Sequence, residues 1–460
     1  MISSVVQFFY PDIKRDEVKK YTTLAVAFFF TIGAYWLLRL LKDVVLFKLT
    51  FPTDLGFDAD MGRTWQPTAK TLSILTVLVA VTIYTKMVDM FEKHKLFYII
   101  AAFYTVCFGF VATVLYLQAT QGSAFVGATV LKYTGIGNYL LTESLGSVLV
   151  ALFWSFTVSI STSDQAKRTF PFIVALGQIG SIGGSALMKV KQLPTWPLFF
   201  VATTFLLGLI VAIYSLIKTT PSDQMKSDHE EKKSKPDFFG GLKLLVSQPY
   251  LMGVLVVSTF YEIAGTIIDY QMKSQASVIF NGSEFQNFLG DFGVASNGLA
   301  FVMALLGTSK IIKNYGVRIC LLIYPISFAI SLVALYMYYQ SGMATSTSLV
   351  WATFGVMMIV KGASYAVNNP VKEMMYIPTS KDAKFKTKGI IDMLGGRSAK
   401  GTGAQVTDYL NVPGNAVASI QNLMLYGSLI SLGVIGVWIM AAIYVGNKNQ
   451  KLVKSGEIIG

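Results

Sequence analysis

Residues 218–237 read KTTPSDQMKSDHEEKKSKPD, a polar stretch that divides an otherwise apolar chain of 460 residues. Apolar residues make up 53% of the chain and charged residues only 14%, against about a quarter in soluble domains. The mean hydropathy is +0.55. This composition excludes an ordinary soluble enzyme, a disordered chain, a collagen and a disulfide scaffold. Because Cys107 and Cys320 both lie in apolar runs, we expect neither a disulfide nor a zinc site.

Six apolar runs lie on each side of this stretch. A helix of about 20 mainly apolar residues is long enough to cross the hydrocarbon core of a bilayer. The runs fall near 21–41, 68–87, 96–117, 139–160, 170–190 and 196–217, and then near 251–270, 287–307, 317–338, 349–367, 390–411 and 420–445. The eleventh run is the weakest, because it is rich in glycine and carries Asp392, Arg397 and Lys400.

The pattern therefore predicts an all-α membrane protein with about twelve transmembrane helices in two six-helix bundles. The expected division is an N-terminal bundle at 1–217, a cytoplasmic linker at 218–250 and a C-terminal bundle at 251–460. We expect no signal peptide and no transit peptide ahead of the first run, since four basic residues precede it without a cleavage pattern.

The formal net charge of +13 has two possible meanings. In a soluble protein it would indicate nucleic acid as a partner, whereas in a membrane protein it is typical of basic cytoplasmic loops. The basic residues gather before the first run and after each even-numbered one, as in Lys93, Lys95, Lys167, Arg168, Lys232, Lys233, Lys384, Lys386, Lys448 and Lys451. This alternation predicts that both termini are cytoplasmic and leaves no charge that requires nucleic acid.

The two halves of the chain echo each other. Lys86 and Lys310 begin short basic turns after the second and eighth runs. After the fourth and tenth runs, the pairs Thr162-Ser163 and Thr379-Ser380 are matched, each followed three residues later by Ala-Lys. Two echoes at equivalent positions indicate an internal duplication. Six plus six helices in parallel halves is the architecture of the major facilitator fold, whose substrate site lies near the midplane between the halves.

Several ionisable residues lie inside the predicted spans, where they are costly and usually face a cavity or a partner. They are Arg39 and Lys42 in span 1, Glu143 in span 4, Glu262 and Asp269 in span 7, Lys361 in span 10, and Arg397 and Lys400 in span 11. Arg39 and Lys42 are three residues apart and so share a helix face. The cations outnumber the acids, which suits a polyanionic substrate whose phosphates accept charge-assisted hydrogen bonds.

Each of these residues also has a structural interpretation. The cations of span 1 lie at nearly the depth of the acids of span 7, so they either close the cavity as an ion pair or clamp the substrate. Lys361 fits core pairing and substrate contact equally, and Glu143 fits a helix-end position as well as a site. The glycine-rich segment around Lys400 is not a phosphate loop, since the order is Lys-Gly-Thr and no strand precedes it.

No catalytic constellation is visible in the sequence. His94 and His229 lie in loops, and no acids cluster. We therefore expect no metal site, no cofactor and no hydrolytic triad, and we interpret the chain as a protein that is not an enzyme.

Three motifs resemble a known family, the nucleotide transporters or ATP/ADP translocases of intracellular bacteria, plastids and some intracellular parasites. The family's first span is similar to L-L-R-L-L-K-D-V-V at 37–45. Its fourth span and the following loop are similar to Y-L-L-T-E-S-L-G-S-V at 139–148 and F-W-S-F-T-V-S-I-S-T-S-D-Q-A-K-R-T-F-P at 153–171. N-P-V-K-E-M-M-Y-I-P at 369–378 is the most specific match, and K-T-K-G-I-I-D-M-L-G-G-R and A-K-G-T-G follow it.

The resemblance implies exchange of ATP for ADP, with proton-coupled nucleotide import and NAD transport as alternatives. It implies that Lys42, Glu143, Asp269 and Lys400 take part in transport. The chain departs from the pattern in span 1, where two leucines at 40–41 replace Asp and Thr, and this departure favours a different nucleotide or coupling mode.

We therefore interpret the chain as a secondary transporter of nucleotides that works by alternating access. An alternative of another class is a membrane sensor or assembly protein that does not transport. We expect ATP, ADP or related nucleotides and the lipid bilayer as partners, no nucleic acid, and a monomer. The expected location is the inner (cytoplasmic) membrane of a bacterium, crossed many times, with both termini cytoplasmic.

Overall fold

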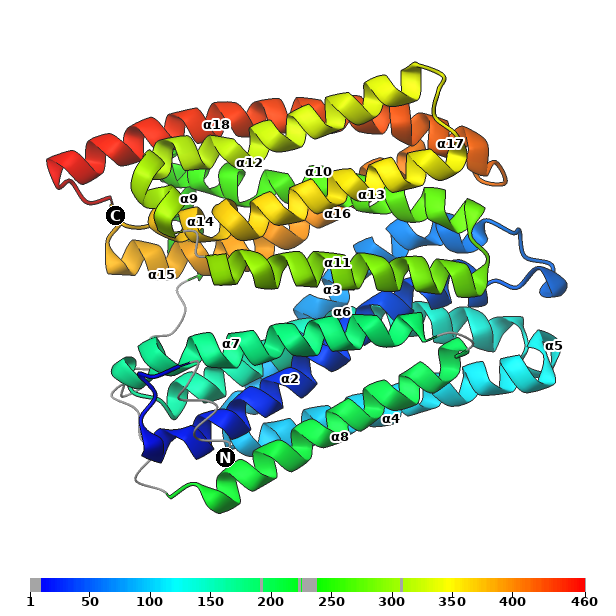
Figure 1. Ribbon diagram of the computed structural model, residues 1–460, viewed down its shortest axis with the longest axis horizontal. Coiled ribbons are helices and arrows are strands. Elements are labelled where there is room, and N and C mark those ends of the chain that lie inside the picture. Colours follow the sequence, from blue (N-terminus) through cyan, green and yellow to red (C-terminus); the bar gives the residue numbers. More distant parts are fainter. Residues whose placement is uncertain (1–9, 191–192, 222–224, 226–237, 307–308, 460) are drawn as a thin grey trace. The chain divides into compact units, whose positions relative to one another are not determined.

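A computed structural model describes residues 10–190, 193–221, 225, 238–306 and 309–459 (Figure 1). Of the linker predicted at 218–250, residues 222–224 and 226–237 lie outside the described residues, whereas 238–247 form a helix and the next helix begins at Pro249. Nearly all of the described chain is helical, and its one isolated β-bridge joins Thr379 to Ile459. Cys107 and Cys320 are free thiols.

The first half of the chain holds seven α-helices. They are α2 (Arg15–Val44), which continues as the π-helical turn η1 (Val45–Leu49), α3 (Met61–Met90), α4 (Lys93–Gln121), α5 (Ser123–Val126), α6 (Ala128–Ser159), α7 (Ser163–Ala186) and α8 (Thr195–Thr219). The short 3₁₀ turns η2 (Thr53–Leu55) and η3 (Leu187–Lys189) connect some of them.

The second half is more broken. Its elements are α9 (Phe238–Ser247), α10 (Pro249–Ile279), α11 (Gly282–Leu306), α12 (Ser309–Gln340), α13 (Ser346–Ala363), η5 (Ser364–Asn368), α14 (Asn369–Met374), α15 (Lys381–Ile390), η6 (Ile391–Gly395), α16 (Gly396–Leu410), α17 (Ala416–Asn422), η7 (Leu423–Gly427) and α18 (Ser428–Ser455). The elements η5, η6 and η7 are π-helical turns inside otherwise continuous helices, a feature that is frequent at functional sites.

Ten helical stretches of the described chain are long and apolar enough to cross a membrane. They correspond to ten of the twelve predicted runs. The predicted eighth run corresponds to α11, and the eleventh corresponds to α15, η6 and α16, where charged and glycine residues lower the hydropathy. The chain is a multi-pass membrane protein.

The chain folds as two compact units, and each takes one short segment from the other half of the sequence. The first unit comprises Met1–Gly62, Leu75–Lys232 and Asn281–Gly298, and the second comprises Arg63–Ile74, Lys233–Phe280 and Leu299–Gly460. These two segments lie in the first parts of α3 and α11, the second long helix of each half. Within the first unit Lys189 forms an ion pair with Asp291 of α11, and within the second Gln405 bonds to Thr71 of α3.

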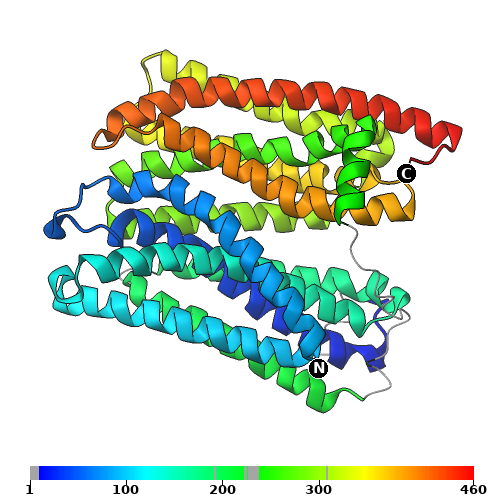
Figure 2. The ribbon, with the colours of Figure 1, turned by 180° about the vertical axis from the view of Figure 1, so that it is seen from behind.

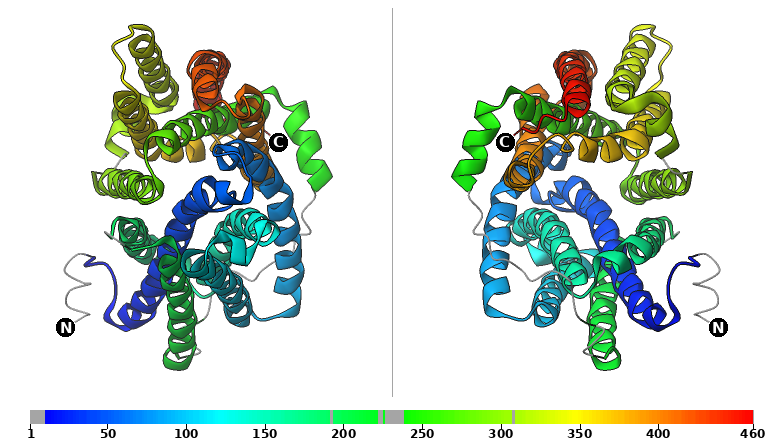
Figure 3. Two further views of the ribbon diagram at one scale, coloured as in Figure 1. Left: turned by 90° about the vertical axis from the view of Figure 1, so that its right-hand side faces the viewer. Right: turned by 90° about the vertical axis from the view of Figure 1, so that its left-hand side faces the viewer.

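The two units have the same internal packing (Figures 1 and 2). In the first unit α2 packs on α6, α7 and α8, and α4 packs on α6 and α8. In the second unit α10 packs on α13, α16 and α18, and α12 packs on α13 and α18. Each of these five helix pairs of one unit thus has its counterpart in the other, which agrees with the duplication expected from the sequence echoes. Figure 3 looks along the long helices of each unit.

The second of the two sequence echoes marks helix starts, whereas Lys86 of the first lies within α3. Thr162 caps α7 by accepting a hydrogen bond from the backbone N–H of Gln165 at 3.3 Å. Ser380 caps α15 in the same way, accepting from the N–H of Ala383 at 3.1 Å. A Ser or Thr side chain satisfies one of the four unpaired N–H groups at a helix N-terminus. The repeated motif therefore fixes the point at which the chain re-enters a helix after the fourth span of each half.

Candidate functional site

The first cluster of charged residues lies where α2 meets α6. Lys42, on the last turn of α2, is only 4% exposed and forms an ion pair with Glu143 of α6. Its Nζ also lies 3.8 Å from the centre of the Tyr139 ring, one turn before Glu143 on the same helix. A buried ammonium is stable only where its charge is compensated. Glu143 and Tyr139 together provide that compensation from one face of α6.

Arg39 lies one turn before Lys42 on α2 and is surrounded by aromatic rings. Its guanidinium carbon is 4.9 Å from the Trp36 ring centre and 5.9 Å from that of Tyr35, and Nη1 donates to the Tyr35 hydroxyl at 3.2 Å. A guanidinium held over rings keeps its planar donor edge oriented, which suits bidentate binding of a phosphate.

Gly146 makes this arrangement possible. A β-carbon at this position of α6 would overlap the Tyr35 ring, so only glycine allows the ring to lie against the helix. The motif Y-L-L-T-E-S-L-G at 139–146 therefore provides three parts of one site: the Tyr139 ring, the Glu143 carboxylate and the space for Tyr35.

The second cluster lies where α10 meets α16. Glu262 Oε1 and Lys400 Nζ are 3.4 Å apart, and the lysine side chain is 41% exposed. Lys361, on the last turn of α13, acts electrostatically on Glu262 and, further along α10, on Asp269. Arg397 precedes Lys400 by three residues on α16.

Asp269 is paired within its own helix. Lys273, four residues further along α10, donates to Asp269 Oδ2 at 2.7 Å, and both side chains are largely buried. Lys70, in the segment of α3 that belongs to the second unit, acts electrostatically on the same carboxylate. The acids of α10 are thus compensated by lysines from α10, α13, α16 and α3.

The glycine-rich segment is a packing surface. A β-carbon on Gly403 would lie 2.7 Å from the carbonyl oxygen of Ile263 and 2.8 Å from the β-carbon of Thr266, so α16 and α10 approach backbone to backbone. A β-carbon on Gly401 would meet the end of the Ile74 side chain of α3, which packs against the glycine. These glycines do not interrupt the helix, since 396–410 is a regular α-helix that follows the π-turn η6.

One expectation about the first unit needs correction, and another stays a prediction. Glu143 is not a helix-end residue, because α6 begins at Ala128 and places it in the middle of the helix. The polar residues of 128–138 hid this first part of the span from the hydropathy pattern. Leu40 and Leu41 are buried, and Leu40 packs against Gly293 of α11. These two leucines therefore contribute to packing within the unit, and the different nucleotide or coupling mode that they favour stays a prediction.

Other site residues were not identified from the sequence. Lys273 could have been found, since acid and lysine four residues apart on a helix form a common pair. Tyr139 could not, because 23 tyrosines make aromatic spacing uninformative. Asp43, beside Lys42, is 1% exposed and is a further buried charge of the first unit. Within the part of the chain that the structure describes, no three metal-ligating side chains gather.

Comparison with known proteins identifies the family. A family model described as TLC ATP/ADP transporter matches residues 1–449. Among curated relatives, a chloroplastic ADP,ATP carrier protein of Arabidopsis thaliana is 26% identical, over 97% of this chain and 77% of its own. ADP,ATP carrier protein 1 of Chlamydia muridarum is 26% identical, over 95% and 89%. ADP,ATP carrier protein 1 of Rickettsia bellii is 24% identical, over 99% and 98%.

Solved structures show the same fold. A nucleoside transporter matches with a TM-score of 0.62 at 14% identity, over 92% of this chain and 98% of its own. A D-xylose–proton symporter matches with a TM-score of 0.64 at 10% identity, over 92% and 96%. The fold is therefore all-helical and major-facilitator-like, as predicted. With a family model matched along almost its whole length, the chain belongs to the TLC ATP/ADP transporter family.

Proposed function

We propose that this chain exchanges ATP for ADP across a membrane by alternating access. The observation that carries the proposal is the buried Lys42, with Arg39 one turn before it on the same helix. An ammonium and a guanidinium so placed match the polyphosphate that all these substrates share. The chain acts as a carrier and not as an enzyme, in keeping with its family.

The ion pairs support exchange over proton coupling. A proton symporter needs a carboxyl group that takes up a proton during the cycle. Here Glu143, Glu262 and Asp269 each lie beside a lysine. A carboxylate whose charge is already compensated needs no proton to remain in the membrane. We infer that these acids hold the lysines in place when no nucleotide is bound, and that phosphate oxygens replace them when one is.

Uptake into proteoliposomes tests the proposal. Vesicles preloaded with ADP are expected to take up labelled ATP, and empty vesicles are not. Because ATP and ADP differ by about one charge near neutral pH, the exchange should also respond to membrane potential. Uptake into empty vesicles that a protonophore abolishes would contradict exchange and indicate a proton-coupled nucleotide importer. Competition by NAD and not by ADP would indicate an NAD carrier, and no nucleotide uptake at all would indicate a sensor or assembly protein.

The proposed binding set comprises Arg39, Lys42, Glu143, Glu262, Asp269, Lys361, Arg397 and Lys400. We propose that the protein is a monomer of two bundles, 1–217 and 251–460, in the inner membrane of a bacterium. The Lys/Arg bias of the loops supports cytoplasmic termini and a cytoplasmic linker. A cysteine at position 230 should then resist a membrane-impermeant maleimide added to intact cells, and efficient labelling would reverse the orientation.

A further inference from the structure

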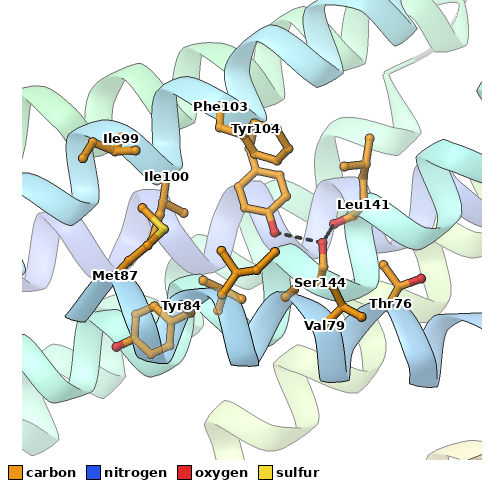
Figure 4. A pocket seen from close by; sticks show the side chains of 13 residues that line it. Thr76, Val79, Tyr84, Met87, Ile99, Ile100, Phe103, Tyr104, Leu141 and Ser144 are labelled. Atoms are coloured by element: carbon orange, nitrogen blue, oxygen red, sulfur yellow. Dashed lines mark hydrogen bonds between the residues drawn. The ribbon is translucent and has the colours of Figure 1, made fainter. Parts of the chain in front are cut away.

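Two cavities follow the seam between α4 and α6 in the first unit. The first has a volume of about 430 Å³ and is lined by α3, α4 and α6 (Figure 4). The second has a volume of about 350 Å³ and is lined by α4 and α6 alone. Leu141 lines both cavities, so they adjoin along the seam, and together they are called the groove. Their walls are almost entirely apolar.

The polar groups in the first cavity are satisfied. The hydroxyls of Tyr104 and Ser144 are 2.8 Å apart, and the Ser144 hydroxyl also donates to the Leu141 carbonyl at 2.8 Å (Figure 4). This part of the groove needs no polar occupant.

Asn138, which lines the second cavity, is different. Its side chain is fully buried, yet neither Oδ1 nor Nδ2 has a hydrogen-bond partner among the described residues. An unpaired buried amide is costly, and native structures rarely keep one without a reason. Asn138 is five residues from Glu143, so the two side chains lie on different faces of α6. The amide therefore belongs to the groove and not to the Lys42 site.

The groove opens toward hydrocarbon. Val106 and Phe110 of α4 line the second cavity, and they are 72% and 60% exposed. Both lie within a membrane-spanning helix, where an exposed apolar side chain faces lipid. The occupant has to come from the bilayer.

The dimensions favour a flexible chain over a protein helix. A helix with its side chains is about 10 Å across, so a volume of 350 Å³ would hold roughly 4–5 Å of its length, less than one turn. Thr134, one turn before Asn138, lines the same cavity and adds a hydroxyl beside the amide.

We propose that this groove binds a phospholipid, with one acyl chain along the α4–α6 seam and an ester carbonyl accepting a hydrogen bond from Asn138 Nδ2. The bilayer already solvates acyl chains, so burial of the chain alone gives no preference for the groove. The hydrogen bond provides that preference, because in hydrocarbon the amide has no other partner. The proposal is independent of which nucleotide is carried.

Glycines at the seam offer a matched pair of variants. A β-carbon on Gly137, which lines the second cavity, meets nothing within 4 Å, and neither does one on Gly109 of α4, which does not line it. Gly137→Leu therefore fills the groove, and Gly109→Leu adds the same side chain elsewhere. Proteoliposomes of phosphatidylcholine with a small fraction carrying a photoreactive acyl chain provide the probe. We expect labels within 99–111 and 133–148 in the parent and in Gly109→Leu, and their loss in Gly137→Leu.

Asn138→Leu tests the hydrogen bond itself. Labelling should fall roughly three- to ten-fold, the value of one hydrogen bond inside a membrane. In lipid-free detergent this variant should melt no lower than the parent, since it removes an unpaired amide. Added phosphatidylcholine should then raise the melting temperature of the parent and not that of the variant. Equal labelling of Gly137→Leu and Gly109→Leu would overturn the proposal, as would a cross-link from the groove to a second copy of the chain.

Discussion

The first helices of the two units, α2 and α10, occupy the same place in their bundles and carry opposite charges. Each packs on the fourth, fifth and sixth helices of its own half. On α2 the charged residues of the first cluster are Arg39 and Lys42, and the compensating acid comes from α6. On α10 they are Glu262 and Asp269, and the compensating lysines come from α10 itself and from α16.

This difference shows that the duplicated halves share their packing but not the charges of their first long helices. The packing of the five helix pairs, the helix caps and the glycine contacts recur in both units, whereas the sign of the charge does not. The lysines of the two clusters also differ in how deeply they are buried. Lys42 is almost completely buried, while Lys400 is 41% exposed and 3.4 Å from its partner. The Lys42–Glu143 pair should therefore contribute more to stability than the Lys400–Glu262 pair does, whereas the Lys273–Asp269 pair of the second unit is about as buried as the pair of the first.

The largest effect should follow from Lys42→Ala. It leaves the Glu143 carboxylate without its ammonium, and breaking a buried pair from one side costs about 3–5 kcal/mol. Exchange should be lost, and binding of ATP should weaken far more than binding of adenosine. Thermal melting and binding measurements on the purified protein give both quantities.

A double variant separates the two roles of Lys42. Lys42→Ala with Glu143→Ala removes both charges, so most of the lost stability should return, because no unpaired charge remains. Transport should not return, because the phosphate contact is still missing. If the double variant exchanges nucleotides like the parent, Lys42 is structural and the charge contrast between α2 and α10 has no part in binding.

The glycine contacts should give the next largest effect. Gly403→Ala forces a methyl group against the Ile263 carbonyl and should cost about 1–3 kcal/mol of stability. Gly146→Ala displaces the Tyr35 ring, and Arg39 should move with the ring because it donates to the Tyr35 hydroxyl. The main effect of this variant should therefore be weaker binding of ATP. Gly265→Ala on α10 is the control: nothing lies within 4 Å of its added carbon, and it should stabilise the helix by up to about 1 kcal/mol. Destabilisation by all three would indicate a general intolerance of these helices and not two specific contacts.

Lys400→Ala should show the opposite balance to Lys42→Ala. Because this lysine is partly exposed, its loss should change stability by less than about 1 kcal/mol. One charge-assisted phosphate contact corresponds to roughly ten-fold in affinity, and ATP binding should weaken by that factor. Lys448→Ala, at an exposed position of α18, is the matched control. Affinity equal to that of the control would leave the second unit without a phosphate contact at Lys400.

The sequence predicted the helices better than the site. Apolar runs of transmembrane length are decided by composition, so the fold and its duplication could be recognised before any contact was known. The start of α6 was missed because Lys132, Thr134 and Asn138 lower its hydropathy, although a buried helix tolerates them. The partner of Lys42 could not be deduced, since pairing across helices depends on packing. The resemblance selected Lys42 and Glu143, and the structure shows that the two side chains form an ion pair.

The smallest effect is expected for two tyrosines near the starts of α2 and α10. These tyrosines test most directly whether the two units are equivalent. Tyr21 of α2 donates to Ser161 at 3.0 Å, in the segment after α6. Tyr250 of α10 donates to the Met375 carbonyl at 2.7 Å, in the segment after α13, and accepts from Asn449 at 2.8 Å. In each unit, a tyrosine of the first long helix thus forms a hydrogen bond with the segment that follows the fourth long helix.

Removing one hydroxyl from each tyrosine compares the two ties directly. Tyr21→Phe and Tyr250→Phe keep the rings and lose the hydrogen bonds, which should cost about 1 kcal/mol each. The Tyr21 hydroxyl also lies 2.9 Å from Gln165 Oε1, but Ser161 and Gln165 both keep other hydrogen bonds when it is lost. Tyr250→Phe should cost more, because it leaves the Met375 carbonyl and the Asn449 amide buried without that partner. Tyr133→Phe, at a 67% exposed position of α6, should melt like the parent. If Tyr21→Phe also melts like the parent while Tyr250→Phe melts lower, the tyrosine hydrogen bond would stabilise only the second unit. The two halves would then differ in their ties as well as in their charges.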